Sequence, residues 1–134
     1  MTRKEARELL MQLLYQMELM NDHTAEAKDA YIAKNFSEKG HKDYANQLMD
    51  LVLTNKDEID AKLNENSNKW TTNRMPKVDL AILRLAACEL IYMEAIPDAV
   101  AINEAVDMAK KYSSDESKGF INGILGKIAK EKDA

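Results

Sequence analysis

The sequence contains little cysteine, proline and glycine. Its 134 residues include one cysteine, two prolines and four glycines. A single cysteine cannot form an internal disulfide bond, so a disulfide framework is excluded and a reducing, cytoplasmic environment is expected. So few glycines and prolines leave little material for the tight turns of a β-sheet protein or for disordered linkers. These absences favour a globular helical protein.

Long apolar runs and catalytic motifs are missing as well. No stretch approaches the roughly 20 apolar residues that a membrane-spanning helix needs. Gln12 interrupts the apolar run near the N-terminus, where an export signal would lie. There is no glycine-rich phosphate loop, no His-Glu-x-x-His motif, no pair of cysteines, and only two histidines are present. We therefore expect no membrane segment, no enzymatic activity, no cofactor and no metal site.

Helical periodicity is the dominant pattern that is present. Apolar residues recur at helical spacing almost throughout, and no window alternates as a strand does. Thr2 with Glu5 forms a capping box at the first helix, and Ser113 with Glu116 forms another at the last. Gly40 is expected in the turn before the third helix. The expected fold is all-α with about seven helices, over residues 2–20, 25–36, 42–54, 57–63, 78–93, 98–112 and 113–130.

One helix is expected at the centre of the fold. Residues 78–93 carry apolar side chains around nearly the whole circumference, which only a helix packed on most sides can hold. Arg84 lies within this helix and is expected to pair with an internal carboxylate. Residues 64–73, which include Trp70, are rich in Asn, Ser and Thr and favour turns. We therefore expect one domain over residues 1–134, with helical halves of about 1–68 and 69–134.

Positive charge is concentrated at the N-terminus. The net charge of the chain is −4, which argues against an indiscriminate nucleic-acid binder. Residues 1–7, however, hold Arg3, Lys4 and Arg7 against Glu5 alone. We call Arg3, Lys4 and Arg7 the basic tip. It predicts weak, local binding of RNA that needs a helper.

The outer face of the first helix admits two interpretations. Its apolar stripe leaves Lys4, Met11 and Tyr15 on nearly the opposite side, with Arg7 on their flank. Basic residues beside an outward Met and Tyr suit a contact with nucleic acid or protein. Alternatively, Met11 and Tyr15 pack on another helix of the same domain. The spacing leaves both interpretations open.

Phe120 lies at the edge of the apolar stripe of the last helix. It shares a ridge with Glu116 and Gly123. A phenylalanine in such a place can stack on an unpaired base, which contributes about 1–3 kcal/mol, and Gly123 would let a base approach closely. In the alternative, Phe120 belongs to the core and Gly123 is a helix-packing contact. Spacing alone favours this alternative.

Four segments spread over the full length carry a specific pattern. They are residues 7–15 with Glu18, 78–84 with 89–90, 97 with 100–106 and 109–110, and 120–125. The most specific parts read Ala-Ile-Asn-Glu-Ala at 101–105 and Phe-Ile-Asn-Gly at 120–123. This pattern resembles the NusB family of transcription antitermination factors. The resemblance implies an all-helical fold of two bundles packed roughly perpendicular to each other.

The resemblance also implies partners. Such proteins bind the boxA element of nascent ribosomal RNA, a single-stranded site, as a complex with NusE, the ribosomal protein S ten. The complex joins RNA polymerase and the other Nus factors and prevents premature termination. The basic N-terminus is shorter here than in arginine-dense members, so RNA binding without NusE is expected to be feeble.

Site residues follow from the same resemblance. The implied RNA-binding residues are Arg3, Lys4, Arg7, Glu116, Lys118 and Phe120. The implied NusE-binding residues are Tyr15, Arg74 and Asp79. A carboxylate at Glu116 should repel phosphate and moderate the affinity. We further expect the basic tip and the Phe120 ring to lie together as one platform for the transcript.

Two other functions and one question of assembly stay open. The chain is alternatively a protein-binding helical adaptor whose basic tip is incidental. It also resembles the RNA-binding domain of ribosomal RNA cytosine methyltransferases, but it carries no glycine-rich cofactor loop and no catalytic cysteine motif. Members of the family occur as monomers and as homodimers, and a homodimer would hide the RNA face until a partner displaces it.

Overall fold

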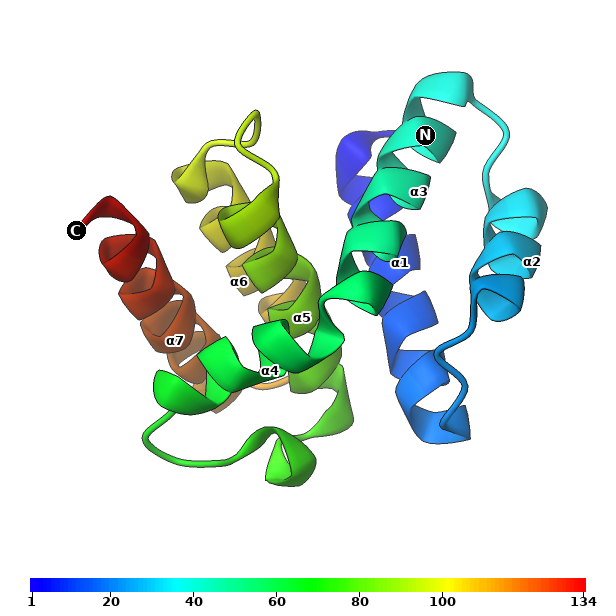
Figure 1. Ribbon diagram of the computed structural model, residues 1–134. Coiled ribbons are helices and arrows are strands. Elements are labelled where there is room, and N and C mark those ends of the chain that lie inside the picture. The colour runs from blue at the N-terminus through cyan, green and yellow to red at the C-terminus, as the bar shows by residue number, and fades with distance from the viewer.

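The computed structural model describes residues 1–134, and it is entirely helical (Figure 1). A short 3₁₀ turn, η1 (Thr72–Arg74), precedes α5. The helices are α1 (Arg3–Met20), α2 (Ala25–Asn35), α3 (Lys39–Thr54), α4 (Lys56–Glu65), α5 (Lys77–Tyr92), α6 (Asp98–Tyr112) and α7 (Asp115–Asp133). The prediction of an all-α fold with about seven helices is confirmed. None of these helices is both long enough and apolar enough to cross a membrane.

The first helix begins as its sequence predicts. The Thr2 hydroxyl accepts the backbone N–H of Glu5 at 3.1 Å, and the Glu5 carboxylate accepts the backbone N–H of Thr2 at 2.7 Å. This capping box satisfies N–H groups that have no partner within the helix. The prediction that Gly40 lies in a turn is wrong, because α3 already begins at Lys39.

The last helix begins one residue later than its sequence predicts. The Ser114 hydroxyl, rather than that of Ser113, accepts the backbone N–H of Ser117, at 3.1 Å. Ser113 instead donates its hydroxyl to the Asp79 carboxylate of α5 at 2.7 Å. A tertiary hydrogen bond to a buried carboxylate has displaced the predicted local cap.

Helix α5 lies at the centre of the molecule, as predicted. It contacts α1, α3, α4, α6 and α7, and all twelve residues from Asp79 to Leu90 are buried. Figure 1 shows α5, α6 and α7 side by side, with α1, α2 and α3 beyond α5 and α4 crossing between the groups. One continuous cluster of 34 buried hydrophobic residues joins them. The predicted division near residue 68 lies between α4 and α5 and stays a prediction.

Arg84 ties three helices together. Its guanidinium donates to the Asp60 carboxylate of α4 at 2.9 and 2.8 Å and to the Glu18 carboxylate of α1 at 2.6 Å. Burial alone would raise the pKa of Glu18, but the hydrogen bond and charge of Arg84 outweigh it and the pKa is lowered. The prediction that Arg84 pairs with an internal carboxylate is confirmed.

Candidate nucleic-acid interface

The three residues of the basic tip lie in different environments. Arg7 is only 5% exposed, and its Nε donates to both oxygens of Glu89 on α5, at 3.3 and 3.1 Å. The Tyr44 hydroxyl donates to the same carboxylate at 2.6 Å. Burial and the neighbouring Glu89 carboxylate raise the pKa of the Tyr44 hydroxyl, so it stays a donor. Arg7 therefore neutralises a buried carboxylate inside the protein, a role that its sequence position did not indicate.

Arg3 and Lys4 remain nearer the surface. The Arg3 guanidinium lies 4.0 Å from the centre of the Tyr44 ring, and its Nη1 has no hydrogen-bond partner. Arg3 also lines a hollow of about 330 Å³ between α1, α3 and the segment after α5. The Lys4 side chain is 50% exposed, and its ammonium lies 3.3 Å from Glu104 and 3.1 Å from Asp107 of α6. Both cations can therefore still meet an anion.

Phe120 forms part of an aromatic pair at the other end of the molecule. Its ring meets the Trp70 ring edge-on, with centroids 5.0 Å apart and planes at 72°. Both rings are partly buried and pack against the edge of the core. The Lys69 ammonium lies 4.3 Å from the centre of the Trp70 ring and forms an ion pair with Glu116. The hydrogen bond from Lys69 lowers the pKa of Glu116.

The surface beside this pair is open on the Gly123 side. A Cβ atom placed on Gly123 would meet no other part of the protein within 4 Å. The alternative that Gly123 is a helix-packing contact is therefore wrong. Lys118, also predicted to contact RNA, is partly buried and forms no ion pair. Phe120 itself is intermediate between the two interpretations, since it touches the core and still reaches the surface.

The residues predicted to contact NusE are only partly together. Tyr15 lines a hollow of about 260 Å³ with Met11, Val78 and Tyr112, and Met11 is buried, as the packing interpretation required. Asp79 lies fully buried beneath this region, and its Oδ2 has no hydrogen-bond partner.

Arg74 lies in the η1 turn and is exposed. It follows the segment that carries Trp70, so its place in the chain is closer to the aromatic pair than to Tyr15 of α1. The structure thus leaves Tyr15 and Asp79 as neighbouring parts of one region and Arg74 as a separate surface residue.

The basic tip and the aromatic pair are separate surfaces. Arg7 is anchored at Glu89, near the C-terminal end of α5, whereas α7 begins beside the N-terminal end, where Ser113 bonds Asp79. Helix α5 is about 24 Å long at 1.5 Å per residue, and α1 and α7 lie on different sides of it (Figure 1). The expectation of one continuous platform is wrong. A transcript would have to run several nucleotides to meet both surfaces.

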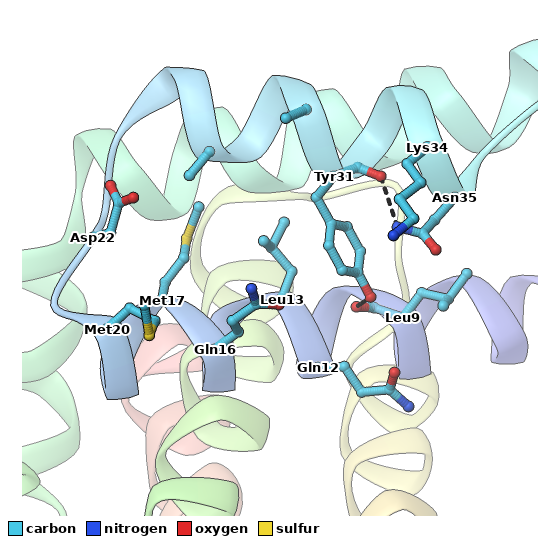
Figure 2. Close-up of a pocket in the computed structure, with 12 residues that line it drawn as sticks. Leu9, Gln12, Leu13, Gln16, Met17, Met20, Asp22, Tyr31, Lys34 and Asn35 are labelled. Carbon is cyan, nitrogen blue, oxygen red and sulfur yellow. Dashed lines mark hydrogen bonds between the residues drawn. The ribbon is translucent and has the colours of Figure 1, made fainter.

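A larger groove lies away from both surfaces. It has a volume of about 540 Å³ and separates α1 from α2 (Figure 2). Its floor carries apolar side chains such as Leu13 and Met17, and Tyr31 crosses it to donate to the Leu9 carbonyl at 2.8 Å. None of the predicted site residues lines it. With Lys34 as its one cation, the groove offers little to a polyanion.

The fold and its surfaces define an all-helical protein that presents rings and cations suited to nucleic acid. A family model described as the NusB family matches residues 4–130. The transcription antitermination protein NusB of Clostridium novyi is 41% identical over 97% of this chain and 99% of its own length. That of Alkaliphilus oremlandii is 42% identical over 98% and 96%. The chain belongs to the NusB family.

Solved structures agree with this assignment. NusB of T. maritima aligns with a TM-score of 0.88 at 32% identity, over 98% of this chain and 92% of that chain. A chain from the crystal structure of the antitermination factors NusB and NusE in complex with dsRNA aligns with a TM-score of 0.85 at 28% identity, over 96% of each. These identities are high enough for the likeness to extend beyond the fold.

Proposed function

We propose that this protein is a transcription antitermination factor that binds the boxA element of nascent ribosomal RNA together with NusE. The observation that carries the proposal is the match over nearly the full length to proteins of that function. The NusB structure solved with NusE and RNA supports both partners. RNA polymerase and the other Nus factors join through the complex. The protein acts in the cytoplasm and by binding, without a catalytic step of its own.

Within this proposal, RNA meets two surfaces of the protein. Arg3 and Lys4 contact phosphates at one end, and Phe120 stacks on a base at the other, with Lys118 and Glu116 beside it. Arg7 supports the first surface from within, because its guanidinium is held by Glu89. Two separated contacts give modest affinity for RNA alone, which explains why a partner is needed to complete the site.

NusE is proposed to bind the region around Tyr15. Tyr15 and the neighbouring apolar residues form a shallow hollow, and Asp79 keeps an unpaired carboxylate oxygen beneath it. Aromatic residues at the edge of a hollow are common anchors of protein interfaces. Arg74, exposed in the η1 turn, is proposed as an outlying contact.

The deciding experiment measures binding of a fluorescently labelled boxA oligomer, with and without NusE. We expect weak binding by the protein alone, clear enhancement by NusE, and preference for boxA over a scrambled oligomer and over the same sequence as a duplex. Equal binding of boxA and the scrambled oligomer, with no enhancement by NusE, contradicts the proposal and favours the adaptor. Light scattering at two concentrations decides whether the free protein is a monomer or a homodimer.

A further inference from the structure

Four side chains meet where the segment after α4 crosses the start of α7. Trp70 and Phe120 form the aromatic pair, and Lys69 and Glu116 form an ion pair beside it. The Lys69 ammonium is held over the face of the Trp70 ring, 4.3 Å from its centre. Only Phe120 and Glu116 were singled out by their place in the sequence. Lys69 and Trp70 come from a segment that the family pattern leaves unassigned.

The position of Lys69 decides whether the Trp70 face is accessible. An aromatic ring offers a base two faces, and here the cation occupies one of them while the Phe120 ring meets the indole edge-on. Glu116 holds the cation in that place through the ion pair. A base can therefore stack on the covered face of Trp70 only after Lys69 has moved.

The contacts that hold Lys69 are weak enough for RNA to displace them. The side chains of Lys69 and Glu116 are 46% and 71% exposed, and an exposed ion pair of this kind shifts an equilibrium by up to about fivefold. A cation over an exposed ring adds about two- to fivefold. Stacking of one base on an aromatic side chain is worth about five- to 150-fold, and the released ammonium gains a phosphate. The exchange therefore favours the RNA-bound arrangement.

We propose that Trp70 and Phe120 together form a two-ring subsite for an unpaired RNA base, and that the Lys69–Glu116 ion pair is a latch that covers it. On binding, the base stacks on Trp70, and Lys69 moves from Glu116 to a phosphate of the same strand. The proposal rests on the proposed RNA-binding function. It also changes the role of Glu116, which lowers the affinity by holding Lys69 over the ring rather than by repelling phosphate directly.

The first test uses Trp70 as its own reporter, since it is the only tryptophan of the chain. With NusE lacking tryptophan or carrying it replaced, boxA RNA is titrated while tryptophan fluorescence and the anisotropy of labelled RNA are both followed. We expect quenching of Trp70 that saturates at the same RNA concentration as the anisotropy. An abasic nucleotide at one position of the oligomer should abolish the quenching.

The outcomes separate this proposal from the one on which it rests. If RNA binds by anisotropy and the fluorescence is unchanged, or if every abasic oligomer quenches equally, the two-ring subsite is wrong and the RNA-binding function stands. If no RNA binds even with NusE, both proposals are wrong.

A double-mutant cycle tests the latch. Glu116→Gln is compared in the natural chain and in Lys69→Met, which keeps the apolar stem and removes the charge. If Glu116 acts by holding Lys69, Glu116→Gln tightens RNA binding by about two- to fivefold in the natural chain and has little effect in the Lys69→Met variant. If Glu116 acts by direct repulsion, the gain is larger in the Lys69→Met variant, because the carboxylate is then unneutralised. That result would overturn the latch.

The chain offers a matched control on the same helix. Lys62 of α4 forms an ion pair with Glu131 of α7, 3.4 Å long, with both side chains about as exposed as Lys69. Glu131→Gln and Lys62→Met remove the same charges from a pair that covers no ring. We expect neither change to alter the quenching of Trp70, and equal effects of the two pairs on quenching would also overturn the latch.

Discussion

The basic tip on α1 and the aromatic pair at the start of α7 are built in contrasting ways. At the tip, the most promising cation, Arg7, is turned inward and bound to Glu89, so a charge that looks available in the sequence is committed to the core. At the start of α7, Phe120 looks like a core residue and yet reaches the surface beside Trp70. Residue type alone therefore misjudges both regions, in opposite directions. Stability should depend on the first region and RNA affinity on the second.

The largest expected effect is on stability. Replacing Arg7 by Ala leaves the Glu89 carboxylate, 1% exposed, without its charged partner, and breaking such a buried pair costs about 3–5 kcal/mol. Urea unfolding followed by circular dichroism measures the change. Lys4→Ala is the control, since it removes an exposed ion pair that contributes at most about 1 kcal/mol. Equal stability of the two variants would show that Arg7 is not a structural residue.

The second effect is on RNA affinity, and the two phenylalanines of the chain provide a matched pair. Phe120→Leu keeps an apolar side chain but removes the ring, so boxA binding in the presence of NusE should weaken by about 1–3 kcal/mol. Phe36, only 3% exposed in the other half, serves as the control, because Phe36→Leu perturbs packing alone. Anisotropy titrations measure both. A similar loss of affinity in the two variants would remove the distinction between a stacking ring and a core ring.

A third, smaller effect concerns the salt dependence of RNA binding. Each phosphate contact on a single strand contributes about 0.7 to the slope of log affinity against log salt. Replacing both Arg3 and Lys4 by Ala should therefore make the slope shallower by roughly 1.4. Lys34→Ala, on exposed α2 near the separate groove, should leave the slope unchanged. An unchanged slope in the double variant would assign the tip to protein binding or to no contact at all.

The smallest effect extends the comparison to the other end of α1. Burial, with the nearby charges of Lys56 and Arg84, lowers the pKa of His23 below its ordinary value of 6.5. The unfolded chain then binds more protons than the folded one just below that pH, so this stability is present above pH 6.5 and is lost as pH falls through the folded pKa. Glu18, whose pKa is also lowered from 4.5, adds a further loss at lower pH. Urea midpoints from pH 7.5 to 5.5 should fall, and His23→Gln should flatten that fall. An equal fall in the variant would contradict this account.

Some parts of the fold followed from local patterns. The capping box at Thr2 needs only residues three apart, and the helix over residues 78–93 is apolar on every side, so both could be recognised without tertiary information. Arg84 inside that helix required a carboxylate because a buried charge is costly alone. The family pattern named Phe120 as a site residue, and the structure leaves that role as a proposal.

Other parts could not be read from spacing. Whether Ser113 caps α7 depended on Asp79, which lies 34 residues earlier in the chain. The inward turn of Arg7 depended on Glu89 and Tyr44, which come from two other helices. The cation over Trp70 depended on where the segment after α4 meets α7. Each of these is a contact between residues far apart in sequence, so no periodicity announces it.

The sequence by itself determined that the chain is helical, which helix is central and to which family it belongs, because helical spacing, circumferential apolarity and short motifs are local properties. Only the tertiary structure decided which charges and rings remain at the surface. Burial, ion pairing and stacking depend on the partners that folding brings together. A lone arginine or phenylalanine in the sequence carries no record of them.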